Sequence, residues 1–125
     1  MSADSPLPAV ALLLSQDLFF TSKITGTASG LGFRVEVEGN RERGLTKVGT
    51  GDYRCVILDL GWKGVSVPEL IANLPDDPRP PVIAFGAHVE TDRLHEARVA
   101  GCAEVLPRSK FSADLPDLLT RYLTI

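Results

Sequence analysis

The chain has 125 residues, close to the commonest size of a single domain and enough to bury one sizeable core, so we expect one domain over residues 1–125. Hydrophobic residues make up 44% and charged residues 23%, with a formal net charge of −3. This composition is ordinary for a soluble globular protein and disfavours sequence-independent binding to nucleic acid. The apolar run at residues 9–14 is too short to span a bilayer, and no basic cluster of the signal-peptide kind precedes it. We therefore expect a cytoplasmic protein without membrane contact, and an extended or disordered segment over residues 1–7.

Strand-like and helix-like segments alternate from the start of the chain. Residues 9–14 are almost continuously apolar, which is typical of a strand buried on both faces. Residues 33–38 alternate apolar and charged side chains, which predicts an edge strand with one wetter face. Residues 40–48 predict a weak helix that is broken near Gly44. Between the two strands, residues 18–29 predict a helix with four apolar residues at helical spacing: Leu18, Phe19, Ile24 and Ala28.

The second half of the chain continues the same alternation. A connector at residues 75–81 holds four prolines and fits neither a helix nor a strand. Cys55 and Cys102 are too few for a disulfide framework and lack the CxxC spacing of zinc ligands, so both are interpreted as small core residues. The remaining predicted elements are strands at residues 55–58, 82–85 and 104–106, and helices at residues 68–74, 91–100 and 111–123.

Five successive strand–helix units with short connections predict an α/β fold. Each parallel crossover needs a helix, and right-handed crossovers place helices on both faces of the sheet. We therefore expect a doubly wound, five-stranded parallel sheet in the order 2-1-3-4-5. Asp59 directly follows the apolar run at residues 55–58, so its carboxylate should lie at the carboxyl end of the middle strand, where open α/β sheets keep their chemistry.

Three segments resemble the receiver domains of two-component response regulators, and the match covers nearly the whole chain. In residues 56–61 (VILDLG), Asp59 sits where receivers carry the phosphoaccepting aspartate. Residues 81–88 (PVIAFGAH) look like the fourth receiver strand, and residues 100–108 (AGCAEVLPR) look like the approach to the fifth. The resemblance implies a signalling module in a phosphorelay, not an enzyme.

The chain departs from the receiver pattern at most of the positions that the resemblance marks as functional. Receivers place two adjacent acids after the first strand to hold Mg²⁺, and the matching residues here are Ser15 and Gln16. Gly86 replaces the hydroxyl residue that steadies the phosphoryl group, and Arg108 replaces the lysine. Val105 stands at the aromatic switch position of the fifth strand.

These departures change the expected charge of the pocket. The receiver pocket carries three carboxylates and one ammonium, which leaves about two negative charges for a hard divalent cation to neutralise. Here one carboxylate and one guanidinium sum to zero, so we expect no bound metal and no other cofactor. Instead, Asp59 is expected to take Arg108 as a bidentate hydrogen-bond partner. The residues expected around Asp59 are Ser15, Gln16, Asp17, Gly86, Ala87 and Arg108.

Two residues near the predicted pocket leave alternatives open. Asp17 lies one residue past the positions of the usual acidic pair, so Asp17 and Asp59 are the candidate ligands if Mg²⁺ binds at all. Alternatively, the place of Asp17 directly before Leu18 suits a helix N-cap. Trp62 could cover the Asp59 site, anchor a partner, or pack against the neighbouring helix.

The sequence therefore supports two main hypotheses about function. The first is a stand-alone receiver-like module that signals through protein–protein interaction without obligatory phosphorylation. The alternative is a working receiver that is phosphorylated on Asp59 by a histidine kinase and uses Mg²⁺. In both, receivers commonly bind partners through the last two helices and the fifth strand, which here run from Thr91 to Ile125. A small α/β enzyme is a third, weaker hypothesis, because this fold hosts many functions.

Overall fold

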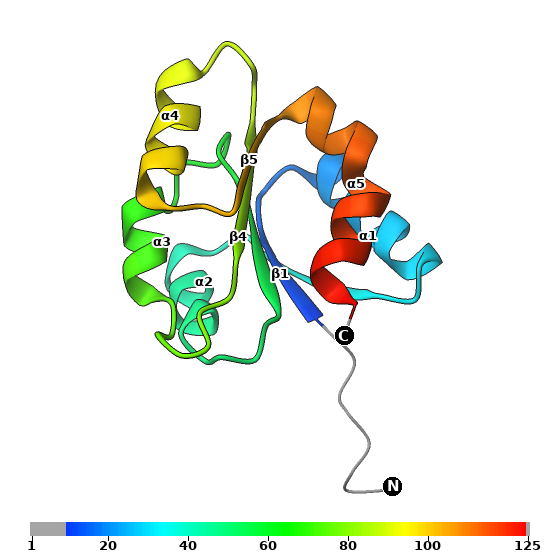
Figure 1. Cartoon of the computed structure of the whole chain (residues 1–125), viewed down its shortest axis with the longest axis horizontal. Coiled ribbons are helices and arrows are strands. Elements are labelled where there is room, and N and C mark those ends of the chain that lie inside the picture. The colour runs from blue at the N-terminus through cyan, green and yellow to red at the C-terminus, as the bar shows by residue number, and fades with distance from the viewer. Residues whose placement is uncertain (1–9, 125) are drawn as a thin grey trace, which may run out of the picture.

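The computed structural model describes residues 10–124 of the chain, so the expectation for residues 1–7 lies outside the described part. Strands and helices alternate throughout (Figure 1). The strands are β1 (Val10–Leu14), β2 (Arg34–Glu38), β3 (Cys55–Asp59), β4 (Val82–Gly86) and β5 (Glu104–Pro107). The helices are α1 (Leu18–Gly30), α2 (Arg41–Val48), α3 (Val67–Asn73), α4 (Thr91–Ala100) and α5 (Arg108–Leu123).

The five strands form one parallel sheet in the order β2-β1-β3-β4-β5, as predicted. β3 is the middle strand, and its last residue, Asp59, is in register with Phe85 of β4. Because all strands run the same way, their carboxyl ends meet at one edge of the sheet. No helix between residues 10 and 124 is both long and apolar enough to cross a membrane.

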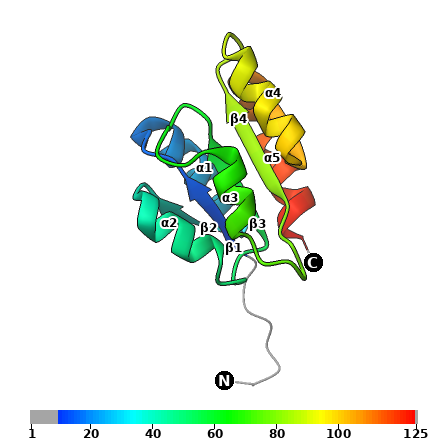
Figure 2. The same ribbon diagram turned by 90° about the vertical axis from the view of Figure 1, so that its left-hand side faces the viewer.

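Alternate residues of the central strands feed two separate cores, one on each face of the sheet. On one face, Leu12 and Leu58 pack beneath α2, α3 and α4. On the other face, Leu13 and Ile57 pack beneath α1 and α5. Figure 1 shows the two helical layers on opposite sides of the sheet, and Figure 2 shows α2, α3 and α4 in front of it. The strands are therefore buried on both faces, which explains their almost continuous apolar sequence.

Three stacked aromatic rings join α1, β4 and α5 beneath the carboxyl edge. The ring of Phe85 lies 4.9 Å from that of Phe20 and 4.4 Å from that of Phe111, measured between centroids. Stacked rings of this kind add stability beyond the area they bury. The stack fixes the start of both helices against the strand next to β3.

Two helices differ in detail from the sequence expectation. Leu18 and Phe19, which the apolar spacing grouped with Ile24 and Ala28, are both 82% exposed. Phe20 instead packs in the core with Ile24 and Ala28. These three residues are four apart and share one helical face. α2 is continuous through Gly44, so the predicted break there is wrong. The glycine instead lets the helix approach the sheet closely, because a Cβ at position 44 would lie 3.1 Å from Leu14 Cδ2.

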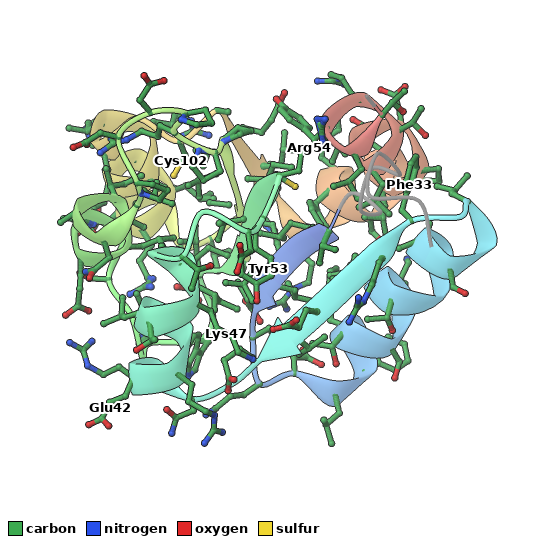
Figure 3. All side chains as sticks on the ribbon, turned by 90° about the horizontal axis from the view of Figure 1, so that it is seen from below. Phe33, Glu42, Lys47, Tyr53, Arg54 and Cys102 are labelled. Atoms are coloured by element: carbon green, nitrogen blue, oxygen red, sulfur yellow. The ribbon has the colours of Figure 1, made fainter. Side chains whose placement is uncertain are left out.

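The edge strand β2 ends in a cluster of charged side chains. Lys47 of α2 lies 2.9 Å from carboxylate oxygens of both Glu36 and Glu38, and the Tyr53 hydroxyl donates a hydrogen bond of 2.6 Å to Glu36. Figure 3 shows Lys47 and Tyr53 beside this edge. The expected alternation fails here, because Glu38 is buried while Val37 is 39% exposed.

The cysteines lie in the core, in agreement with their interpretation. Cys55 is fully buried and Cys102 packs against the core from a partly buried position. Neither forms a disulfide. Burial raises the pKa of the Cys55 thiol to about 12 and that of Cys102 to about 11, so both are protonated and unreactive at neutral pH.

Glu38 generates a prediction about stability. Burial alone would raise its pKa, but hydrogen bonds from Lys47, Arg43 and the Asn40 N–H outweigh burial and lower the pKa from 4.5 to about 2. Since the folded-state value lies below the unfolded one, the stabilisation is complete at neutral pH and is lost as the pH falls from 4.5 toward 2. Glu38→Gln should lower the free energy of unfolding at pH 7 by about 1–2 kcal/mol, measured by urea denaturation.

The matched control is Glu42→Gln. Glu42 is exposed on α2 and points away from the sheet (Figure 3), so its substitution should change stability by less than about 0.5 kcal/mol. The gap between the wild type and Glu38→Gln should close as the pH falls to about 2. Equal losses for the two variants at pH 7 would contradict the assigned role of Glu38.

Candidate functional site

The carboxyl ends of β1, β3 and β5 bring Ser15, Asp59 and Arg108 together at one edge of the sheet. Ser15 follows β1, Asp59 ends β3, and Arg108 begins α5 directly after β5. A hollow of about 370 Å³ opens beside Asp59. Its lining comes from three loops at this edge and comprises Gln16, Asp17, Asp59, Gly61, Trp62, Lys63 and Arg108.

The Asp59 carboxylate is held by groups of the chain itself. Its Oδ2 accepts a hydrogen bond of 2.8 Å from Ser15 Oγ, and its Oδ1 accepts one of 2.8 Å from the Gly61 N–H. Asp59 is only 3% exposed, so these bonds replace the water that a buried carboxylate loses. Both oxygens of the phosphoacceptor-position residue therefore have partners.

Arg108 stands near Asp59 without hydrogen bonding to it. Its Nη2 lies 3.9 Å from Asp59 Oδ1, which is an ion pair but too long for a hydrogen bond. The prediction of a bidentate pair is therefore wrong. The guanidinium lies over the Phe20 ring instead, 5.5 Å from its centroid. Gly61 permits even this approach, because a Cβ there would lie 3.0 Å from Asp59 Oδ1 and 3.3 Å from Arg108 Nη2.

The two residues beside Ser15 are engaged elsewhere. Asp17 Oδ1 accepts a hydrogen bond of 3.0 Å from the Phe20 N–H, which confirms that Asp17 is the N-cap of α1. Gln16 Nε2 donates a bond of 2.8 Å to the Gly39 carbonyl. Both residues line the hollow, but neither contacts Asp59 by a hydrogen bond in the described structure.

The donor set at Asp59 does not fit Mg²⁺. Asp59, the Ser15 hydroxyl and Asp17, which caps α1, offer few free oxygen ligands, and the two cations Arg108 and Lys63 leave no surplus negative charge. Mg²⁺, in contrast, requires nearly octahedral oxygen coordination and dehydrates reluctantly. Among residues 10–124, no group of three or more His, Cys, Asp or Glu side chains could surround a metal ion.

A close contact between Leu60 and Gly86 lies beside the site, and sequence reasoning missed it. Leu60 is fully buried, and its N–H donates a hydrogen bond of 2.8 Å to the Phe85 carbonyl. A Cβ at Gly86 would lie 3.1 Å from the Leu60 Cβ. A hydroxyl-bearing residue at position 86 would therefore press against Leu60. No sequence pattern revealed this contact, since it depends on the turn that follows β3.

The other expected residues fall outside the hollow. Val105 is partly buried and packs against the core beneath α4, and Ala87 lines a different hollow that also borders Arg108. Trp62 is 9% exposed and belongs to the core cluster, as in the interpretation that it packs against neighbouring elements. Trp62 nevertheless also lines the hollow, together with Lys63.

Of the comparisons with known proteins, the one with solved structures agrees with this architecture. No family model matches the sequence, and no curated protein matches it. Among solved structures, the receiver domain of a sensor histidine kinase from Pseudomonas aeruginosa superposes with a TM-score of 0.77 at 17% identity, over 95% of this chain and 100% of that one. The chain has the receiver-domain fold.

Two further structures place the chain in the same group of folds. A response regulator from Hahella chejuensis superposes on this receiver fold with a TM-score of 0.79 at 18% identity, over 94% of this chain and 96% of that one. A phosphorylated cyanobacterial phytochrome response regulator gives a TM-score of 0.76 at 12% identity, with the same coverage. The Pseudomonas domain contains a magnesium ion in its active-site cleft. At such identities the likeness establishes the fold alone, so the chemistry must be argued from the residues present.

The mismatch with Mg²⁺ predicts weak metal binding. Isothermal titration of the wild-type chain should show no Mg²⁺ site tighter than the millimolar range, because among the described residues Asp59 is the only buried carboxylate that lines the hollow. The variant Ser15→Asp, Gln16→Asp adds two carboxylates and should bind Mg²⁺ more tightly. A micromolar site in the wild type would contradict the prediction.

Proposed function

We propose that this chain is a cytoplasmic, receiver-like signalling module that acts by binding a protein partner, without obligatory phosphorylation of Asp59. The observation that carries the proposal is the state of the Asp59 carboxylate. Ser15 Oγ and the Gly61 N–H bind its two oxygens, and Ser15 and Gln16 stand at the two positions where receivers carry their acidic pair. The receiver fold supports a role in signalling and requires no catalytic activity.

Electrostatics argue against efficient phosphotransfer at this site. An attacking carboxylate and an incoming phosphoryl group are both negative, so the reaction depends on cations that neutralise the developing charge. Here the nearby cations are Arg108, whose Nη2 is 3.9 Å from Asp59, and Lys63 on the rim of the hollow. Each Asp59 oxygen also accepts a hydrogen bond, Oδ2 from Ser15 Oγ and Oδ1 from the Gly61 N–H, and these bonds lower the nucleophilicity of the carboxylate.

The residues that would transmit a signal are also missing. A ligand shifts a conformational equilibrium only as far as it interacts differently with the two states. Gly86 has no hydroxyl to draw toward a phosphoryl group, Leu60 fills the space beside it, and Val105 has no ring to reorient. We therefore propose that the chain holds one conformation.

Amide hydrogen exchange tests this constitutive state. A fluoroberyllate phosphoryl mimic with Mg²⁺ should leave protection over α4, β5 and α5 unchanged, because no side chain couples Asp59 to that surface. Asp59→Asn under the same conditions is the control and should behave like the wild type. A protection change in the wild type that Asp59→Asn abolishes would show a working phosphorylation switch.

The proposed partner surface consists of α4, β5 and α5, within the range Thr91 to Ile125. Its partner would be a histidine kinase or a downstream regulator. Val99 on α4 is 73% exposed, which makes it a suitable apolar contact. Arg121 is less suitable as a probe, because it already pairs with Glu104 and Asp117 at 2.8 and 2.9 Å.

Affinity purification from source cells tests both the surface and the independence from phosphorylation. The partner recovered with the wild type should also be recovered with Asp59→Asn, and should be depleted at least several-fold with Val99→Ser. Val37→Ser is the matched control, since Val37 is a half-exposed valine on β2, at the opposite edge of the sheet. Loss of the partner with Asp59→Asn, or equal loss with both valine variants, would contradict the proposal.

A further inference from the structure

A second hollow, of about 430 Å³, lies on the other side of Arg108. It opens between the start of α1, the connection after β4 and the first turn of α5. Its volume falls within the range of small-molecule sites. The lining residues with chemical relevance are Phe19, Lys23, His88, Arg108, Ser109 and Ser112.

The lining of this hollow suits an anion. Lys23 and Arg108 supply two positive charges, Ser109 and Ser112 supply hydroxyl donors, and His88 adds a ring nitrogen, whereas no carboxylate belongs to the lining. Lys23 donates to Ser112 Oγ across the hollow, which leaves two of its three ammonium protons for a ligand. Converging donors without an acidic neighbour are the usual recognition elements for phosphate oxygens.

Arg108 has hydrogen-bonding capacity that its surroundings do not use. Its Nε is buried and has no acceptor among residues 10–124, and its distance to Asp59 is beyond hydrogen-bonding range. The guanidinium is nevertheless held in place over the Phe20 ring. An oxyanion in the hollow, with a small rotation of the guanidinium, would supply the acceptor that this cation lacks.

The rim of the hollow also offers an aromatic surface. Phe19 is 82% exposed, although its neighbour Phe20 is buried in the aromatic stack. An exposed aromatic ring beside a polar hollow favours a ligand with a flat, apolar part that can lie against it.

We propose that this hollow binds a small phosphate monoester that carries an aromatic ring. The phosphate lies between Lys23, Arg108 and the two serines, and the ring of the ligand packs against Phe19. No covalent step is involved. The site does not use Asp59, so the proposal does not rest on the phosphorylation state of that residue.

Amide NMR titration with phenyl phosphate, without Mg²⁺, tests the site. Shifts should concentrate at Lys23, Ser109 and Ser112, with saturable binding. Inorganic phosphate and phenol, which each carry half of the ligand, should both bind at least fivefold more weakly. The titration should give the same result in Asp59→Asn, which excludes an effect of phosphorylation at Asp59. Shifts that require Asp59, or that centre on Gly61 and Lys63, would overturn the proposal.

Two variants assign the halves of the ligand, and one provides the control. Lys23→Gln should weaken phenyl phosphate binding about tenfold, and Phe19→Ser should reduce its affinity to that of inorganic phosphate. Lys110→Gln is the matched control, because it removes a lysine charge close to the hollow. Lys110 lies beside Ser109 in the first turn of α5, but it pairs with Asp114 and does not line the hollow. The affinity of the Lys110→Gln variant for phenyl phosphate should differ less than twofold from that of the wild type. Equal weakening in Lys23→Gln and Lys110→Gln would show general charge attraction and overturn the proposal.

Discussion

The burial of a single carboxylate at the end of the middle strand constrains the rest of this edge of the sheet. Asp59 is 3% exposed, and a buried carboxylate without hydrogen bonds is costly enough to unfold a small domain. Ser15 and the Gly61 N–H satisfy it with neutral donors. A negative charge next to Asp59 would raise that cost unless a cation accompanied it. Replacing the acidic pair with Ser15 and Gln16 is therefore compatible with a metal-free edge.

The same edge shows how one substitution makes another tolerable. Leu60 can pack against the main chain of β4 because position 86 is glycine, and Arg108 can approach Asp59 because position 61 is glycine. Any side chain at position 86 would bring its Cβ to 3.1 Å from the Leu60 Cβ, so the turn after β3 would have to shift by a few tenths of an ångström to admit a hydroxyl there. The residues at positions 59, 60, 61, 86 and 108 are thus coupled through packing, and a change at one of them affects its neighbours.

Sequence reasoning was strongest where burial dominates and weakest where local groups compete. The apolar run ending at Asp59 and the regular alternation of elements were enough for the sheet order and the position of the carboxylate, because these depend on side-chain periodicity. The face of α1 was misassigned, since Leu18 and Phe19 also fit a helical spacing. The spacing of Phe20, Ile24 and Ala28, counted from a cap at Asp17, would have identified the correct face.

The geometry of the site could be predicted only in part. Matching strand ends correctly brought Asp59 and Arg108 near one another. The positions of the strand ends could not show that the Ser15 hydroxyl and the Gly61 N–H would bind the two carboxylate oxygens. These two donors lose less conformational entropy than the long Arg108 side chain would on forming the same bonds. The contact between Leu60 and Gly86 depends on the path of the turn after β3, and the spacing of apolar residues in the sequence does not predict that path.

The charged cluster on β2 has a consequence for how copies of the chain meet. An edge strand with free main-chain groups can pair with a strand of another molecule, and charged side chains on such a strand oppose this. Lys47, Glu36 and Glu38 lie at the outer edge of the sheet, with Glu38 buried and ionised. A second chain adding a strand there would have to displace these ion pairs. The cluster therefore disfavours the addition of a strand at the β2 edge of the sheet.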